Sequence, residues 1–240
     1  MSIWTECEGT KFQKHLDLEP WRMVEAQHLS SSRDLVDSRQ EHDLLENLLE
    51  HTKPKVNGNK HYLIFTPFRY PPLAYGSRFG STLEPSLWYG SLNLNTALAE
   101  VAFYRLKFFE DTSANLDYIE LPMTAFNAYI NTSKGIDLTE APFHEYQDQI
   151  SNKTSYLESQ ELGTKMRKAK IEAFVFTSAR DRVLGKNVAA FTPDIFYAKN
   201  KKFVDNLQNW RCIANKRVIE FTRDDILCRQ NYEFFKENFE

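Results

Sequence analysis

Three polar residues, Arg78, Tyr89 and Glu100, lie beside glycine or hydrophobic residues in the sequence. Glu100 belongs to the apolar stretch TALAEVAFYR. Burying an ionised carboxylate without a partner is costly, so such a residue usually has a dedicated partner or a chemical task. Arg78 lies between two glycines in GSRFG, where a guanidinium suits bidentate capture of a phosphate or carboxylate. Tyr89 directly precedes a glycine, and a tyrosine there can stack on a ligand ring while its hydroxyl group hydrogen-bonds.

Each of these residues also has a structural interpretation. Arg78 would tie down a loop through backbone carbonyls, Tyr89 would belong to the core, and Glu100 would form a buried salt bridge with Arg105 or Arg78. On a helix, Glu100 shares a face with Ala97 and Tyr104, while Leu98, Val101, Ala102, Arg105 and Phe109 share another, so the helix is expected to be apolar nearly all round and packed on both sides. The local sequence leaves the structural and the chemical interpretation of each residue open.

A second polar group follows the apolar run of FVFTSARDRVLGKN. Ser178 lies where this run becomes polar, and Asn187 follows in the next polar turn. A serine in that place would also begin a turn or cap a helix. No histidine–aspartate pair is apparent in its local sequence, so a hydrolase triad has weak support. The histidines do not fall at metal-ligand spacings, and no metal site is predicted.

The pattern of short apolar runs and turns predicts a mixed α+β fold in a single domain. The eight glycines do not fall at the spacings of a Rossmann or Walker phosphate loop. Residues up to about 27 are interpreted as loop, and KPKVNGNK as an exposed turn. The spacing predicts helices at 30–51, at 155–170 and after a cap at Asn95 or Thr96, and strands at 61–71, 87–91, 116–126, 135–139, 171–181 and 216–226.

The composition argues against several classes of protein. A chain of 240 residues with 42% hydrophobic content can bury a substantial core, which argues against a disordered chain. A net charge of −3 and a pI near 6.1 argue against direct nucleic-acid binding, and KNKK at 199–202 is interpreted as a solvated loop. No secretory signal or membrane span is visible, and three scattered cysteines suit neither a disulfide framework nor a zinc site. These features predict a soluble cytoplasmic protein.

Several motifs, taken together and in order, resemble the RES domain family, named for its Arg, Glu and Ser. Arg78, Tyr89 and Glu100 follow one another at intervals of 11 residues, which fits the family pattern. The resemblance covers most of the chain from about 21 to 193. The matching motifs are WRMVEAQ at 21–27, GSRFG at 76–80, LWYGS at 87–91, TALAEVAFYR at 96–105, and TSARD with GKNVAAFTP within 177–193.

This resemblance implies an ADP-ribosyltransferase-like core, with a mixed sheet and flanking helices, in a single RES domain over 1–240 that carries a helical insertion around 30–60. Known members are mostly toxins of bacterial toxin–antitoxin pairs that degrade NAD+ by phosphorolysis or hydrolysis, and their antitoxins are typically Xre-like helix-turn-helix proteins. The family's first arginine corresponds to Arg22 or Arg69. The implied catalytic residues are Arg78, Tyr89 and Glu100, and the implied substrate-binding residues are Arg22, Arg69, Ser178 and Asn187.

The resemblance implies no cofactor, because NAD+ is the substrate and inorganic phosphate a candidate co-substrate. Cleavage of the nicotinamide–ribose bond passes through an oxocarbenium-like transition state that a fixed carboxylate stabilises. Water, phosphate or a protein would each serve as acceptor, so a mono-ADP-ribosyltransferase is an alternative. A non-enzymatic binding protein on the same scaffold is a second alternative. Self-association as a homodimer is compatible with such a chain.

Overall fold

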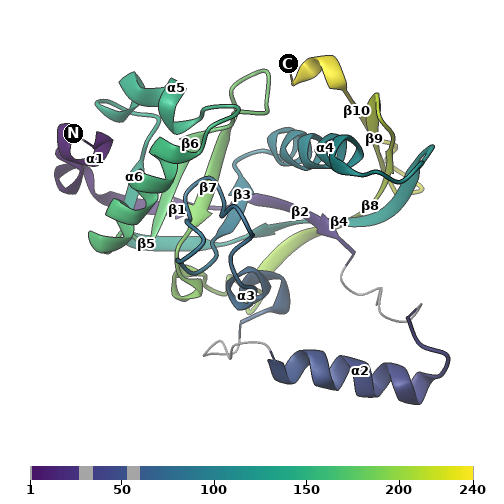
Figure 1. Ribbon diagram of the computed structural model, residues 1–240. Coiled ribbons are helices and arrows are strands. Elements are labelled where there is room, and N and C mark those ends of the chain that lie inside the picture. The colour runs from purple at the N-terminus through teal and green to yellow at the C-terminus, as the bar shows by residue number, and fades with distance from the viewer. Residues whose placement is uncertain (1, 27–34, 53–59, 240) are drawn as a thin grey trace.

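The computed structural model describes residues 2–26, 35–52 and 60–239 (Figure 1). Its helices are α1 (Ile3–Glu6), α2 (Arg39–Thr52), α3 (Tyr62–Arg69), α4 (Leu94–Asp111), α5 (Gln147–Ile150) and α6 (Leu157–Lys168). Its strands are β1 (Lys14–Leu18), β2 (Trp21–Glu25), β3 (Trp88–Ser91), β4 (Ile119–Ala128), β5 (Ile130–Asp137), β6 (Ala173–Thr177), β7 (Lys186–Ala190), β8 (Val204–Ala214), β9 (Val218–Arg223) and β10 (Asn231–Phe235).

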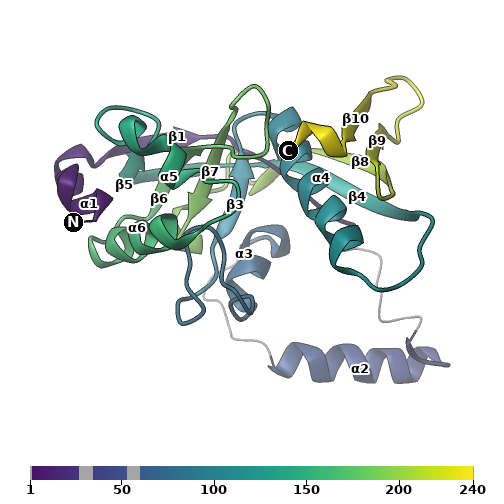
Figure 2. The ribbon, with the colours of Figure 1, turned by 45° about the horizontal axis from the view of Figure 1, so that its top comes forward.

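The described strands form one sheet in the order β1-β5-β6-β7-β3-β2-β4-β8-β9-β10. Strands β5 and β6 pair in parallel, and the other neighbouring strands pair antiparallel. Helices flank this sheet (Figures 1 and 2). The predicted α+β class, with a mixed sheet and flanking helices, is therefore confirmed.

Strand β6 shows how the core is divided between the two faces of the sheet. Phe174 and Phe176 pack with Leu162 and Met166 of α6, while Val175 belongs to the cluster that includes the buried residues of α3. This follows from the two-residue period of a strand, which sends successive side chains to opposite faces. The face that carries Phe174 is the one on which the cavity described below lies.

Cross-strand pairs extend this face toward α4. Phe174 lies opposite Ala189, Ala189 opposite Tyr89, and Ser91 opposite Trp21. Residues directly opposite each other point to the same face, so these side chains share one surface of the sheet. Trp21 packs against the buried cluster of α4, β4, β8 and β9. Helices α6 and α4 therefore pack on two different parts of the same face of the sheet (Figure 2).

Strands β2 and β3 separate soon after they meet. They share the single pair of Trp21 and Ser91, whereas β3 pairs with β7 along its whole length. Their close approach needs a glycine, because a Cβ on Gly90 would lie 2.7 Å from the Trp21 carbonyl oxygen. Beyond the pair of Trp21 and Ser91, β2 and β3 separate, and the gap between them lies between the region of the sheet covered by α4 and the region covered by α6.

Helix α4 begins at Leu94, two residues before the earlier of the two predicted starts. Asn93, and not Asn95 or Thr96, caps it, and its side chain accepts a hydrogen bond of 2.9 Å from the Thr96 backbone amide. The helix then buries an apolar stripe against the sheet, while Glu100 on another face is only partly buried. The buried hydrophobic residues of α4 are Ala97, Leu98, Ala99, Ala102, Leu106 and Phe109.

The strand predicted at 61–71 is wrong, because this segment forms helix α3. The His61 side chain caps the helix by accepting a hydrogen bond from the Leu63 amide. Ile64 is fully buried and Phe68, four residues later, packs against the same cluster, which is helical spacing. A short apolar run cannot be assigned to helix or strand by periodicity alone, and α3 contains a proline, Pro67, a residue that disfavours the interior of a helix.

The predicted loop up to residue 27 is also wrong, because it contains strands β1 and β2. Strands β7, β8 and β10 were not predicted either. Four of the five residues of β7 are buried, so this strand has no alternation of polar and apolar residues to reveal it. The strands predicted at 87–91, 116–126, 135–139, 171–181 and 216–226 and the helix at 155–170 are confirmed, with shifted ends.

Helix α2 falls within the predicted helical segment around 30–60 and stands apart from the sheet (Figures 1 and 2). None of its residues is buried, and a 2.6 Å ion pair joins its Glu50 to Arg69 of α3. The predicted turn KPKVNGNK lies outside the described residues, except for its last lysine. Within the described ranges, no helix is both long enough and apolar enough to cross a membrane.

Candidate active site

Glu100 is held by two side chains from distant parts of the chain. The Ser178 hydroxyl and the Asn187 side-chain amide each donate a 2.6 Å hydrogen bond to the same atom, Glu100 Oε1. Within the described residues, Glu100 Oε2 has no hydrogen-bond partner. The carboxylate is thus fixed through one oxygen, and its other oxygen remains available to a ligand.

The turn after β6 fixes the direction of the Ser178 hydroxyl. Ser178 Oγ accepts 3.1 Å hydrogen bonds from the backbone amides of Arg180 and Asp181. Its own hydrogen therefore points to the carboxylate. Asp181 in turn accepts a 2.6 Å hydrogen bond from Thr96 at the start of α4. This contact connects the turn to the helix that carries Glu100.

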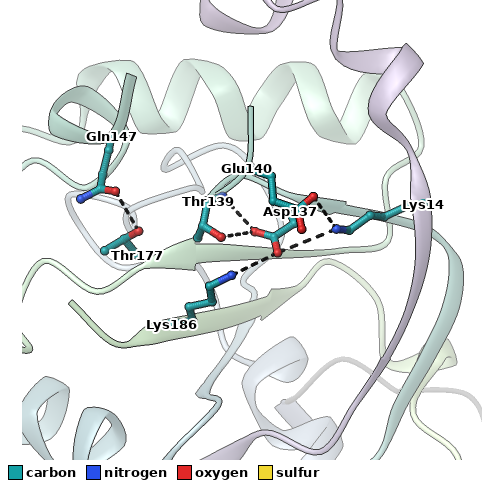
Figure 3. Close-up of polar contacts among 7 residues, drawn as sticks. All are labelled: Lys14, Asp137, Thr139, Glu140, Gln147, Thr177 and Lys186. Atoms are coloured by element: carbon teal, nitrogen blue, oxygen red, sulfur yellow. Dashed lines mark hydrogen bonds and ion pairs between the residues drawn. The ribbon is translucent and has the colours of Figure 1, made fainter. Parts of the chain in front are cut away.

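The strand end before Ser178 is anchored by a polar network (Figure 3). The Thr177 hydroxyl donates to the Gln147 side chain of α5 at 3.3 Å. Beside it, Asp137 at the end of β5 forms ion pairs with Lys186 of β7 at 3.4 Å and Lys14 of β1 at 3.9 Å. The two ion pairs link β5 to β1 and, across β6, to β7, while the Thr177 hydrogen bond ties the end of β6 to α5. These contacts support the position of the Ser178 turn.

Asn187 is oriented by a second hydrogen bond. Its side-chain oxygen accepts a 2.7 Å bond from the Ser91 hydroxyl of β3. Ser91 and Asn187 are buried and lie directly opposite each other on β3 and β7. The amide group of Asn187 therefore turns its nitrogen toward Glu100.

Tyr89 lies at the centre of β3 with its hydroxyl group tied to the GSRFG loop. This oxygen is 2.9 Å from Ser77 Oγ and accepts a 3.3 Å hydrogen bond from the Phe79 amide. Burial raises the pKa of Tyr89, so the phenol stays neutral at physiological pH. Its ring lines the cavity in a fixed orientation, in contact with Phe176.

Arg22 fills the gap where β2 and β3 diverge. It donates a 2.6 Å hydrogen bond to the Tyr89 carbonyl and lies 5.2 Å from the centre of the Trp88 ring. Its Nε atom is buried without an acceptor in the described part of the chain. Burial lowers the pKa of Arg22 to about 10, and the guanidinium remains charged near pH 7.

Arg78 both faces the cavity and ties down a loop through backbone carbonyls. It lines the cavity, yet its guanidinium also donates to the carbonyls of Asn152 at 2.8 Å and Ile150 at 3.4 Å. These bonds hold the loop between α5 and α6 against the GSRFG loop.

Six of the seven residues implied by the resemblance come together around these elements. Arg22, Arg78, Tyr89, Glu100 and Asn187 line one cavity of about 600 Å³, and Ser178 contacts it through Glu100. Arg69 is not among the described lining residues and pairs instead with Glu50 of α2. The structure therefore places Arg22, and not Arg69, beside the other site residues.

The sequence interpretation overlooked several lining residues. Ser77 and Ser91 lie within the motifs GSRFG and LWYGS. Membership of these motifs is the sequence signal for them, although neither is among the predicted site residues. Tyr104 was noticed only as a neighbour of Glu100 on the helix. The other described lining residues are Trp21, Met23, Val24, Glu25, Gly90, Ala97, Val101, Arg105, Met123 and Phe176. The described residues contain no group of three His, Cys, Asp or Glu side chains that could hold a metal ion.

Comparison with protein families matches residues 55–214 to the RES domain. This range covers two thirds of the chain and includes Arg78, Tyr89, Glu100 and Ser178, but it begins after Arg22. A comparison with curated proteins gives no match. Among solved structures, a chain of the M. tuberculosis MbcT–MbcA toxin–antitoxin complex aligns with a TM-score of 0.48 and 10% identity, over 84% of this chain and 89% of that one.

Proposed function

The chain belongs to the RES domain family, and from that premise we propose that it cleaves the bond between nicotinamide and ribose in NAD+. The observation that carries this proposal is the fixed carboxylate of Glu100. Two donors hold its Oε1, while Oε2 has no partner in the described residues. Such a carboxylate can accept hydrogen bonds from the ribose hydroxyls and stabilise the positive charge that develops as the glycosidic bond breaks.

The remaining site residues suit the rest of the dinucleotide. The Tyr89 ring is held at its hydroxyl end by two partners, so its face can orient the nicotinamide ring. Arg22 and Arg78 line the same cavity, and guanidinium groups suit the pyrophosphate. Nicotinamide leaves as a neutral molecule, so no strong general acid is needed.

Family membership also supports a role as the toxin of a toxin–antitoxin pair. In this proposal, cleavage of NAD+ harms the cell, and an Xre-like helix-turn-helix antitoxin binds the chain and restrains it. Expression of the wild-type chain, but not of Glu100→Gln, should then stop growth and lower cellular NAD+. Co-expression of the antitoxin should restore both.

The direct test measures NAD+ loss and product identity with and without inorganic phosphate. Phosphate-dependent ADP-ribose 1″-phosphate would identify a phosphorylase, and free ADP-ribose without phosphate would identify a glycohydrolase. Glu100→Gln keeps an oxygen that Ser178 and Asn187 can bond, so we expect it to fold. A unit charge about 4 Å from the developing cation contributes about 4 kcal/mol at an effective dielectric constant of about 20, or roughly a thousandfold in rate.

Glu110→Gln is the matched control, because Glu110 is an exposed glutamate near the end of the same helix. It should retain full activity. Undiminished NAD+ loss by Glu100→Gln would refute the role of this carboxylate. No NAD+ loss by the folded wild-type chain would refute the proposed reaction and favour transfer to a protein or a non-enzymatic role.

A further inference from the structure

Helix α2 (Arg39–Thr52) carries an apolar stripe that remains largely exposed. Its four leucines form two pairs at a spacing of four residues, so they lie along one side of the helix. No residue of α2 is buried, and Leu44 and Leu48 are 60% and 58% exposed. A helix of 14 residues is marginal in water by itself, because most helices in proteins are stabilised by packing an amphipathic face. The stripe therefore calls for a packing partner that the described part of the chain does not supply.

The sequence of α2 has nearly the same pattern in both directions. HDLLENLLEH, residues 42–51, runs from each end as a histidine, an acidic residue and two leucines. A twofold interface joins the same surface of each copy, with residue i against residue j and j against i. Two α2 helices packed antiparallel about the midpoint of this segment would bring the leucine pair 44–45 of one copy against the pair 48–49 of the other. The stripe is therefore complementary to itself.

The charges of α2 also suit a second copy better than a membrane. Asp43, Glu46 and Glu50 lie on the side of the helix opposite to the leucines. Two copies can therefore join their stripes without bringing these carboxylates together. A helix that lies on a membrane surface carries Lys and Arg on its polar face, whereas α2 has a single arginine, Arg39, and no lysine. An anionic lipid surface is therefore a poor match.

Both ends of α2 are fixed within the molecule. Ser38 and Glu41 form a capping box, in which the Ser38 amide donates to Glu41 Oε2 at 3.1 Å and the Glu41 amide donates to Ser38 Oγ at 3.2 Å. At the other end, Glu50 pairs with Arg69 of α3 at 2.6 Å. The helix lies on the side of α3 and presents its stripe at a distance from the sheet (Figures 1 and 2). A second copy can therefore reach the stripe without a change in the core.

We propose that α2 is a dimerisation helix, whose leucine stripe packs antiparallel against α2 of a second copy of this chain. Helix α2 precedes residues 55–214, which match the RES domain, so the contact belongs to the additional segment and not to the matched region. One pair of helices of this length makes a small interface, and the dimer should be weak, with a dissociation constant on the order of 10 µM.

The first test is sedimentation velocity of the full chain between about 1 and about 200 µM, a range that brackets this dissociation constant. We expect the 28.1 kDa monomer to convert to a dimer as the concentration rises. The double variant Leu44→Gln/Leu48→Gln should raise the dissociation constant at least about a hundredfold, because four leucines leave the interface. Glutamine has a helix propensity close to that of leucine, and both positions are exposed, so the variant should fold. Leu227→Gln is the matched control, since Leu227 is 96% exposed between β9 and β10, and it should dimerise normally.

A disulfide experiment tests the antiparallel arrangement. The exposed Cys228 is first replaced by serine, which leaves the buried Cys7 and Cys212. In the antiparallel pair the two copies of Leu44 are offset by about 7.5 Å along the helix axis, too far for a disulfide. Leu44→Cys alone should therefore not cross-link under mild oxidation, whereas its mixture with Leu48→Cys should form the mixed disulfide. Peptide mass spectrometry identifies the joined residues.

Several results would overturn the proposal. They are a wild-type chain that stays monomeric over the whole concentration range, equal dimerisation by Leu44→Gln/Leu48→Gln, and efficient cross-linking of Leu44→Cys to itself. A monomer that sediments with vesicles of phosphatidylcholine and phosphatidylserine would assign the stripe to a membrane instead. A monomer whose binding to an antitoxin is lost in Leu44→Gln/Leu48→Gln would assign it to that protein. These measurements contain no NAD+, so they do not depend on whether the chain cleaves it.

Discussion

The substitution Ser178→Ala tests the idea that one hydroxyl group serves both the site and the fold. Ser178 Oγ donates to Glu100 Oε1 at 2.6 Å and accepts from the amides of Arg180 and Asp181 at 3.1 Å. Alanine removes the bond to the carboxylate and leaves two buried amides without their acceptor. We therefore expect losses of both activity and stability.

The two losses have different sizes. A hydrogen bond to a charged group contributes about 1.5–3 kcal/mol, which corresponds to roughly a 10- to 150-fold fall in kcat/KM for NAD+. Each orphaned buried amide costs about 1–3 kcal/mol, so the free energy of unfolding should fall by about 2–6 kcal/mol. In a chain of this size each kcal/mol lowers Tm by about 2–4 °C.

The assay compares NAD+ turnover and thermal unfolding for three variants. Asn187→Ala removes the other donor to Glu100 but no acceptor of the Ser178 turn, so it should lose activity with a smaller loss of stability. Ser86→Ala removes a hydroxyl group that bonds to an exposed carbonyl away from the cavity and should change neither property. Ser178→Ala with wild-type activity, or inactive with unchanged Tm, would refute the reasoning.

Two further predictions concern the surroundings of the site. A Cβ on Gly185 would lie 2.1 Å from Thr96 Oγ1 and 2.5 Å from Asp181 Oδ2, so Gly185→Ala should lower the free energy of unfolding by about 1–3 kcal/mol, as overpacking does. Chemical denaturation measures this, and an unchanged midpoint would contradict the tight contact. Burial raises the pKa of Cys212 to about 11, whereas Cys228 is exposed. A thiol reagent at pH 8 should therefore label Cys228 in the native protein and Cys212 only in denaturant, as peptide mass spectrometry would show; rapid native labelling of Cys212 would contradict the buried position.

The sequence identifies the candidate site residues better than it identifies the side chains that they contact. Glu100 was identified because a carboxylate in an apolar helix requires a partner or a task. Its partners Ser178 and Asn187 are 78 and 87 residues away, and no local pattern encodes such distances. Which of Arg22 and Arg69 lies beside the cavity likewise depends on tertiary structure. Arg22 lines the cavity because its strand β2 meets β3, whereas Arg69 lies at the end of α3.

The errors in secondary structure have physical causes of the same kind. Residues 61–71 form a short apolar run whose helical spacing becomes visible only when Ile64 and Phe68 pack on one cluster. Strand β7 is buried on both faces, so it lacks alternation. Burial on two sides removes the periodic signal on which sequence interpretation depends.

The divergence of β2 from β3 connects the fold to the candidate site. Tyr89 has no pairing partner in β2, and its carbonyl accepts the hydrogen bond of Arg22 instead. A side chain thus replaces a backbone partner, and the opened sheet leaves room for the cavity. The exchange has an energetic cost, since burial lowers the pKa of Arg22 to about 10, and an arginine is normally charged up to about pH 12.5 or above. Retaining a destabilised cation where an aliphatic side chain would fill the gap is expected of a residue that binds an anionic ligand.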